Sequence, residues 1–290
     1  MSAEFIQQVI EARRVPGAAR DALMNRRQSA TVVPEGKFLV IAADHPARGA
    51  FAAGADSHAM ANRWDLLERI KTALDVPGVS GYLGSADTVE DLALLGALDG
   101  KWVFGSMNRG AILGAEWELD DRQTGYTTTS VVELGLAGGK MLVRIDPNDR
   151  GSLTTLEWAG RTVSELAAAQ KIAMVEPFMS RRVGNKVTND LSTDAVVTSA
   201  AIASALGDTS AYTWLKLPDT DVFVRLAEST TLPIVILGGE VKDDEAATFA
   251  RWEQLLALPN VIGLVIGRSL LYPPSGDVHA AVARAAQLVA

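Results

Sequence analysis

The sequence predicts an α/β fold, a single (β/α)8 TIM barrel, and three observations lead to this prediction. Its 290 residues suit one barrel with some additional chain. Eight short apolar runs recur with amphipathic segments between them, which favours parallel strand–helix units over hairpins. No GxGxxG motif follows the first run, so the competing architecture, a doubly wound open sheet, fits less well.

The predicted strands are short runs rich in aliphatic and aromatic residues. In the first half of the chain they are "KFLVIAADH" (37–45), "GVSGYLGS" (78–85), "KWVFGSMN" (101–108) and "KMLVRIDP" (140–147). The second half adds "IAMVEPF" (172–178), "TWLKLP" (213–218), "PIVILGG" (233–239) and "VIGLVIG" (261–267).

The segments between these runs have apolar residues at helical spacing, and several begin with acidic residues, Ser or Thr, as helices prefer. The clearest predicted helices are 58–74, 88–98, 162–170, 193–206 and 243–258. Residues 1–36 are expected to form a helical extension packed on the barrel, and residues 37–290 the barrel itself.

Composition excludes several classes of function. The net charge of −8 and the pI near 5.0 argue against a general nucleic-acid or membrane-surface binder, because those partners select basic patches. The absence of cysteine excludes disulfides, thiolate metal sites and a thiol nucleophile. The three histidines are too scattered for a zinc site, so neither a metal nor a cofactor is expected. With no signal-peptide pattern and no long apolar span, we expect a cytoplasmic enzyme.

A barrel of this kind carries its active site at the carboxyl ends of its strands. Polar and charged residues, together with glycine pairs, collect at the ends of the predicted strands. They are Asp44-His45, Asn108-Arg109, Asp146, Glu176, Lys216, Gly238-Gly239 and Gly267-Arg268. The sequence therefore places the candidate site at one end of the barrel.

Alternation of strand faces puts many charged side chains inside the barrel. Lys140, Arg144 and Asp146 share one face of their strand, while Lys216 shares a face with Trp214. The expected interior charges are Lys216, Arg144, Lys140, Glu176, Asp146 and Asp44, although Lys140 also begins its predicted strand. An internal network of ion pairs would explain any one of them, but their collection at strand ends favours an active site.

Lys216 is the expected centre of the chemistry. A lysine becomes a nucleophile when burial or a neighbouring cation lowers its pKa, and Lys216 lies between apolar neighbours in the sequence. An imine formed on it acts as an electron sink, so that a carbon–carbon bond can break while a nearby acid or base moves protons. Glu176 and Asp44 are the candidates for those proton transfers.

Two further regions predict anion binding. Gly238, Gly239, Gly267 and Arg268 follow the last two strands, where barrels often bind phosphate through backbone N–H groups, although a Gly-Gly pair is by itself only a turn signal. Arg181, in "SRRVGNK" (180–186), could grip an anionic substrate or belong to an exposed loop. The long segment 108–126 is interpreted as a lid or a subunit contact.

Six motifs in order, "ADHPARG", "KMLVRIDPND", "MVEPF", "TWLKLP", "ILGGE" and "GLVIGRSLLYP", resemble class I aldolases of the deoxyribose-phosphate and fructose-bisphosphate aldolase superfamily. Tagatose-bisphosphate and sulfofructose-phosphate aldolases are the nearest well-known branches. The resemblance implies a Schiff base on Lys216, catalytic carboxylates at Asp44 and Glu176, and phosphate binding by the glycines with Arg268. Asp146 stands where the archaeal-type enzymes have a tyrosine acid and is more similar to the tagatose branch, in which Arg144 has no obvious counterpart.

A second set of motifs, "SMNRG", "ELDDR", "YTWLKLP" and "GRSLLYP", resembles an actinobacterial group associated with myo-inositol breakdown. This resemblance implies cleavage of 2-deoxy-5-keto-D-gluconate 6-phosphate to dihydroxyacetone phosphate and malonate semialdehyde. Arg144 or Arg181 would read the carboxylate of this substrate. The alternatives are a sulfofructose-phosphate or tagatose-bisphosphate aldolase, and a catalytically silent metabolite sensor. A homo-oligomer is expected, and because relatives of this fold assemble in several ways, the sequence does not fix the number of subunits.

Overall fold

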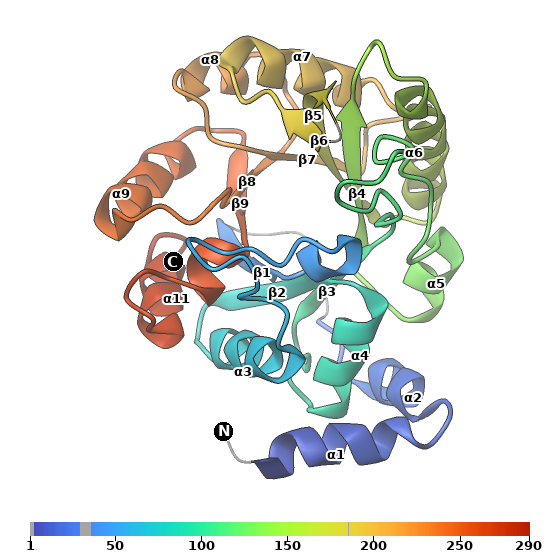
Figure 1. The fold of residues 1–290 in the computed structure, drawn as a ribbon, viewed down its shortest axis with the longest axis vertical. Helices are drawn as coiled ribbons and strands as arrows, with labels where there is room; N and C mark the ends of the chain where they lie inside the picture. Colours follow the sequence, from blue (N-terminus) through green and yellow to red (C-terminus); the bar gives the residue numbers. More distant parts are fainter. Residues whose placement is uncertain (1–2, 30–35, 185) are drawn as a thin grey trace.

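Eight parallel strands close into a barrel in the computed structural model, which describes residues 3–29, 36–184 and 186–290. The barrel strands are β1 (Phe38–Ala42), β2 (Val79–Gly84), β3 (Trp102–Ser106), β4 (Gly138–Ile145), β5 (Ile172–Val183), β7 (Thr213–Leu217), β8 (Ile234–Leu237) and β9 (Val261–Ile266). Parallel pairing of β1 with β9 and of β4 with β5 completes the ring seen in Figure 1. The predicted (β/α)8 barrel is confirmed.

Helices surround the strands, as the view of Figure 1 shows. They are α3 (Arg63–Leu74), α4 (Ala86–Leu94), α5 (Thr128–Glu133), α6 (Gly151–Ala168), α7 (Thr193–Ser204), α8 (Phe223–Glu228), α9 (Glu245–Leu256), α10 (Arg268–Leu271) and α11 (Val278–Gln287). Two helices precede the barrel, α1 (Ala3–Arg13) and α2 (Ala18–Asn25), and they pack beside α4. None of the described helices combines the length and apolar character that a membrane span needs.

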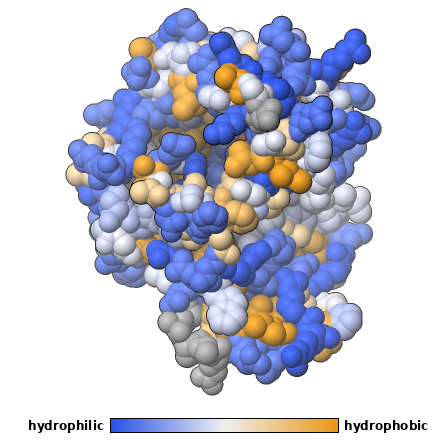
Figure 2. Space-filling model, in the orientation of Figure 1, coloured by the Kyte–Doolittle hydropathy of each residue, from blue (hydrophilic) through white to orange (hydrophobic). Residues whose placement is uncertain are grey.

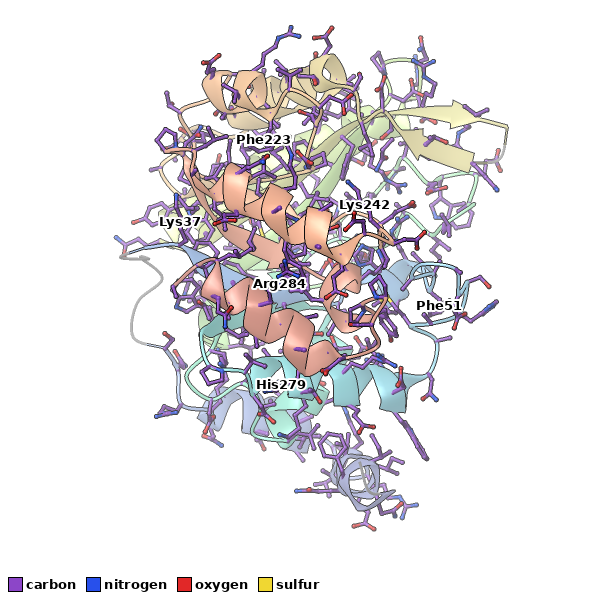
Figure 3. All side chains as sticks on the ribbon, turned by 90° about the vertical axis from the view of Figure 1, so that its left-hand side faces the viewer. Lys37, Phe51, Phe223, Lys242, His279 and Arg284 are labelled. Carbon is purple, nitrogen blue, oxygen red and sulfur yellow. The ribbon has the colours of Figure 1, made fainter. Side chains whose placement is uncertain are left out.

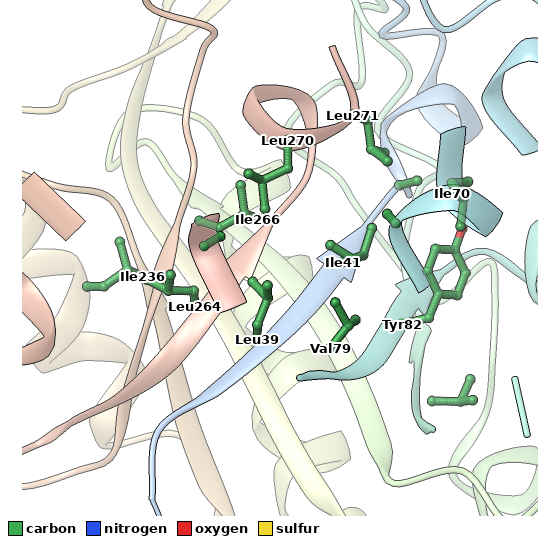
Figure 4. Packing of buried hydrophobic residues seen from close by; sticks show 14 of the residues in the cluster. Leu39, Ile41, Ile70, Val79, Tyr82, Ile236, Leu264, Ile266, Leu270 and Leu271 are labelled. Carbon is green, nitrogen blue, oxygen red and sulfur yellow. The ribbon is translucent and has the colours of Figure 1, made fainter. Parts of the chain in front are cut away.

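Alternate residues of each strand bury two separate apolar clusters. The outward residues of neighbouring strands, such as Leu39, Ile41 and Leu264, pack against the helices (Figure 4). The inward aromatic residues fill the end of the barrel where the strands begin: the ring centroid of Trp214 lies 5.3 Å from that of Phe38. Because this end is filled with apolar side chains, the inward polar residues are left at the carboxyl end.

The two ends of the barrel are well separated in the side view of Figure 3. Lys37 marks the end where the strands begin, and Phe51 and Lys242 mark the loops at the opposite end. Figure 2 shows that the face seen in Figure 1 is largely hydrophilic, with apolar side chains over the β3–α5 loop. Ile112 and Leu113 of that loop are about half exposed, at 48% and 52%.

One strand pair was not predicted. β5 continues beyond the barrel to Val183 and pairs in antiparallel fashion with β6 (Lys186–Asn189), with Ser180 opposite Asn189. The sequence left the charged segment 180–186 as either an anion-binding segment or an exposed loop. The structure places it in the hairpin, and Gly184 takes the positive φ of 62° that the turn requires.

Candidate active site

Four ionisable side chains inside the barrel form one chain of ion pairs. Lys216 Nζ donates a hydrogen bond to Glu176 Oε1 at 2.8 Å, and Glu176 Oε2 pairs with Lys140. Lys140 Nζ also lies 3.3 Å from Asp44 Oδ2. All four residues are buried, with exposures of 7% or less. The network thus links β1, β4, β5 and β7 through buried charges.

Strand alternation explains how these side chains meet. Met174 and Trp214 belong to the inner cluster and are paired across β5 and β7, so Glu176 and Lys216, two residues further along, also face inward. Asp44 lies two residues beyond the end of β1, where the chain turns into the short 3-10 helix η1 (His45–Arg48). The local fold therefore brings two lysines and two carboxylates from four neighbouring parts of the barrel into one network.

Asp44 is held by β3 as well as by Lys140. Ser106 Oγ donates a hydrogen bond to Asp44 Oδ2 at 3.0 Å, and the buried guanidinium of Arg109 pairs with the same oxygen. The other oxygen, Oδ1, has no hydrogen-bond partner among the described residues. The carboxylate of Asp44 is thus fixed in place by one of its oxygens, while the other is buried without a hydrogen bond from the described residues to satisfy it.

The electrostatics of this network favour a reactive amine. Burial lowers the pKa of Lys216 below its usual value, and Arg109 and Arg268 lower it further against the opposing effect of Glu176. The pKa of Lys140 is also lowered, by burial and then by Arg109. Burial alone would raise the pKa of Glu176, but Lys140, Lys216 and Arg109 hold it well below its usual value. Glu176 is therefore a carboxylate that contacts two amines.

Lys140 is the member of the network that the sequence analysis left out of the expected site. Alternation of strand faces predicts Lys140 in the interior, but Lys140 is the first residue of the predicted strand 140–147 and so is expected far from the carboxyl end. β4 begins earlier, at Gly138, and pairs Lys140 with Ser106 of β3 and Met174 of β5. The side chain of Lys140 is completely enclosed, whereas that of Lys216 keeps 4% exposure. The sequence feature that could have identified Lys140 as a site residue is its position on the inward face of its strand.

Asn108 joins the end of β3 to β4. Its amide donates hydrogen bonds to the carbonyl oxygens of Leu142 and Asp121, at 2.7 and 3.2 Å, and its carbonyl accepts one from Leu142 N at 2.8 Å. The side chain thereby satisfies buried backbone groups of β4 next to the ion pairs. It fixes the start of the long loop that runs from β3 to α5.

The residues predicted to bind phosphate lie beside one another. Helix α10 begins directly after Gly267, and Ser269 Oγ donates to the carbonyl oxygen of Gly238 at 3.2 Å. Arg268 Nη2 donates to the carbonyl oxygen of Gly239 at 3.2 Å, and burial lowers the pKa of Arg268, which remains a cation. The loop after β8 and the first turn after β9 thus form one surface that carries a guanidinium.

Arg144 lies inside the barrel and contacts an acidic residue of this protein. Its Nη1 is 2.6 Å from Glu118 Oε1, and its Nη2 donates to the carbonyl oxygen of Glu118 at 2.7 Å. Glu118 belongs to the β3–α5 loop and is fully buried. Sequence reasoning missed Glu118 because nothing in the segment 108–126 indicates which of its acidic residues turns inward.

Asp146 and Arg181 are not brought into the ion-pair network. The carboxylate oxygens of Asp146 accept hydrogen bonds from Asn148 N at 3.0 Å and from Arg182 N at 3.1 Å, which ties the end of β4 to the hairpin. Arg181 is exposed. Both residues line a polar cavity of about 840 Å³ between β4, β5 and α7, outside the chain of ion pairs. Among the described residues, no group of three or more His, Asp or Glu side chains is arranged to hold a metal ion.

His45 follows Asp44 and borders the same charges. Its Nδ1 lies 3.9 Å from Asp44 Oδ1. Burial and the nearby cations Arg268 and Lys216 hold the pKa of His45 well below its usual value. The imidazole is therefore neutral at neutral pH, and it adds a polar group to the site without adding charge.

Solved structures of aldolases share this fold. A Schiff-base-forming fructose-1,6-bisphosphate aldolase is 18% identical, with a TM-score of 0.64, over 94% of this chain and all of its own. A fructose-bisphosphate aldolase from Slackia heliotrinireducens is 14% identical, with a TM-score of 0.62, over 97% of this chain and 84% of its own. At these identities the likeness shows a common TIM-barrel architecture.

A nearer relative is a protein of Corynebacterium glutamicum, Cgl0159. Its crystal structure is 51% identical in sequence, with a TM-score of 0.95, and the match covers all of this chain and 98% of that one. Comparison with curated proteins gives no match. A family model described as Cgl0159-like matches residues 36–286, which is nearly the whole barrel. The chain belongs to the Cgl0159-like family.

Proposed function

We propose that this protein is a class I aldolase that forms a Schiff base between Lys216 and a phosphorylated keto sugar or keto sugar acid. One observation carries the proposal: a buried amine of lowered pKa lies 2.8 Å from a carboxylate at the carboxyl end of the barrel. The shared fold with Schiff-base-forming aldolases supports it. An amine of this kind is the nucleophile that imine chemistry requires.

In the first half of the reaction, neutral Lys216 Nζ attacks the ketone carbon of the substrate. A proton passes to the carbonyl oxygen to give a carbinolamine, and loss of water then leaves a protonated imine. Glu176 is the group placed to relay these protons, because it contacts Lys216 directly and can return the proton through Lys140. Lys140 touches two carboxylates, so it connects Glu176 with Asp44, the other candidate for proton transfer.

In the second half, the imine withdraws the electron pair of the adjacent carbon–carbon bond. A base removes the proton of the hydroxyl group on the carbon beta to the imine, that carbon leaves as an aldehyde, and an enamine remains on Lys216. Protonation of the enamine carbon and hydrolysis of the imine release the ketone product. Asp44 is the candidate base, since its Oδ1 has no hydrogen-bond partner among the described residues.

The best candidate substrate is 2-deoxy-5-keto-D-gluconate 6-phosphate. Cleavage between its third and fourth carbons would yield malonate semialdehyde and dihydroxyacetone phosphate. Gly238, Gly239, Gly267 and Arg268 would hold the phosphate, and a guanidinium near the ion-pair network would bind the carboxylate, for which the sequence offered Arg144 and Arg181. Tagatose bisphosphate and sulfofructose phosphate are the alternative substrates. The cytoplasmic location and the homo-oligomer expected from the sequence belong to the same proposal, and light scattering measures the latter.

Borohydride trapping tests the proposal. The protein is incubated with dihydroxyacetone phosphate, reduced with sodium borohydride, digested and mapped by mass spectrometry. We expect a covalent adduct on Lys216, none in Lys216→Met, and unchanged trapping in Lys71→Met, which alters a partly exposed lysine of α3. An adduct on Lys140 would reassign the nucleophile, because that amine also has a lowered pKa.

A substrate panel then separates the named alternatives. Dihydroxyacetone phosphate released from the sugar acid phosphate, and not from tagatose bisphosphate or sulfofructose phosphate, is the expected result. Binding of all three without cleavage, together with no trapped adduct, would indicate a metabolite sensor that keeps the fold.

A further inference from the structure

Two arginines face a single carboxylate beside the ion-pair network. Arg48 ends η1, Arg144 lies on β4, and Glu118 comes from the β3–α5 loop. Glu118 Oε1 is 2.6 Å from Arg144 Nη1 but 3.6 Å from Arg48 Nη1, so only the first contact is a hydrogen bond. Arg48 was not among the residues that the sequence singled out.

This cluster contains N–H donors that have no acceptor among the described residues. Arg48 Nε, Arg48 Nη1 and Arg144 Nε are buried and have no hydrogen-bond partner among the described residues. Burial and then the charge of Arg144 lower the pKa of Arg48 to about 10, against the attraction of Glu118. Buried guanidinium groups without partners are costly, and a further anion would satisfy them.

Both terminal nitrogens of Arg144 already donate hydrogen bonds to Glu118 of the β3–α5 loop. Arg144 binds both the carboxylate and the main-chain carbonyl of Glu118, and Glu118 Oε2 accepts a hydrogen bond from Gly114 N at 2.9 Å. The main chain of Arg48 is fixed too, because Leu113 N donates to its carbonyl oxygen at 3.0 Å. The side chain of Arg48 keeps 18% exposure. Arg48 is therefore the cation of this cluster that can reach a ligand.

Arg144 lies across the barrel from the predicted phosphate loops, and the side chain of Arg48 approaches the Glu118–Arg144 pair from the end of β1. Around the closed sheet, β4 is four strands from β9 in either direction. Arg144 on β4 and Arg268 after β9 thus stand on opposite sides of the opening, and β7 with Lys216 lies on the path between them. A linear substrate with its ketone at Lys216 and its phosphate at Arg268 would direct its other end toward Arg48.

We propose that Arg48, oriented by the Glu118–Arg144 pair, is the receptor for a carboxylate at the end of the substrate remote from the phosphate. The inference rests on the proposed function and names its substrate class, a phosphorylated sugar acid. Glu118 cancels one of the two positive charges, which leaves a net single charge that matches a monoanionic carboxylate. A second phosphate would carry more negative charge than the cluster can neutralise and would meet Glu118.

Calorimetric binding of three sugar derivatives that lack a ketone tests this subsite. They are 6-phosphogluconate, with a carboxylate, glucitol 6-phosphate, with neither carboxylate nor second phosphate, and glucitol 1,6-bisphosphate. We expect 6-phosphogluconate to bind about tenfold or more tightly than glucitol 6-phosphate, the ratio for a charge-assisted hydrogen bond. In Arg48→Gln this ratio should fall to near one, and Arg48→Lys should restore part of it.

Glu118→Gln tests the charge argument. It should bring the affinity for the bisphosphate closer to that for 6-phosphogluconate, and urea unfolding of each variant verifies that it folds. Equal binding of 6-phosphogluconate and glucitol 6-phosphate by the unmodified protein, or a ratio that Arg48→Gln leaves intact, overturns the proposal. Preference for the bisphosphate overturns it as well.

The two proposals fail separately. None of the three probes can form an imine, so their affinities do not depend on whether Lys216 is a nucleophile. Discrimination without a borohydride adduct would keep the carboxylate subsite and remove the aldolase. An adduct without discrimination would keep the aldolase and remove the subsite.

Discussion

Lys216 Nζ lies 2.8 Å from Glu176 Oε1, and Glu176 uses its other oxygen to pair with Lys140. One carboxylate therefore contacts two buried amines. Any proton that leaves Lys216 changes the charge that Lys140 experiences, because the two amines share this partner. The reactivity of Lys216 thus depends on its neighbours as well as on its own burial, which has the largest effect on its pKa.

Arg109→Met is expected to raise the pKa of Lys216. Arg109 is one of the cations that lower it, so its removal makes the ammonium form easier to keep. Since imine formation needs the neutral amine, the acid limb of the pH profile for borohydride trapping should move to higher pH. Each pH unit of movement lowers the trapping rate at neutral pH about tenfold.

Glu176→Gln is expected to lower the pKa of Lys216. Glu176 raises the pKa of Lys216, so loss of its charge should move the acid limb of the same profile to lower pH, even if the maximal rate falls. The position of the limb is the quantity to compare. Movement of both variants in one direction would contradict the electrostatic account.

Asn108→Ala is expected to lower the free energy of unfolding by about 1–3 kcal/mol, since it leaves buried backbone groups of Leu142 without a partner. Urea unfolding measures the change. Asn148→Ala is the matched control, because the exposed side chain of Asn148 makes only a 3.5 Å contact to Asp146. Its expected change lies within about 0.5 kcal/mol. Equal losses in the two variants would show that the bonds of Asn108 to β4 are not the cause.

Local pattern was enough to predict part of this site. Apolar runs located all eight barrel strands, and the period-two alternation placed Glu176 and Lys216 on the inner face with Met174 and Trp214. These features depend only on neighbours in the same strand. They follow from the sequence because each strand must bury its outward side chains against the helices.

Other parts of the site depend on contacts between distant segments. The pairing of Glu118 with Arg144 joins residues 26 positions apart, and it is decided by the path of the β3–α5 loop. Asp146 follows the end of β4, so alternation no longer fixes its direction, and its carboxylate meets backbone N–H groups instead. β6 forms only because β5 extends to meet it.

Gly267→Ala is expected to weaken binding of dihydroxyacetone phosphate. A Cβ at Gly267 would overlap the carbonyl oxygen of Ala42, so the turn before α10 must shift and carry Arg268 with it. We expect the KM of the aldolase reaction to rise about tenfold, with a smaller change in kcat. Gly36→Ala is the control, because a Cβ there meets nothing within 4 Å. An unchanged KM would place the phosphate elsewhere.

Asp146→Asn separates a catalytic carboxylate from a structural one. The sequence made Asp146 a candidate acid, yet its two oxygens hold Asn148 N and Arg182 N and lie outside the ion-pair network. The amide of Asn can still accept one of these bonds, so we expect activity within about threefold of the unmodified enzyme. Glu176→Gln and Asp44→Asn remove carboxylates from the network and should lower kcat by about 10²–10⁴-fold, the usual contribution of a general acid or base. Steady-state release of dihydroxyacetone phosphate measures all three variants. A loss in Asp146→Asn as large as that in Glu176→Gln would return Asp146 to the chemistry and require the end of β4 to turn inward when substrate binds.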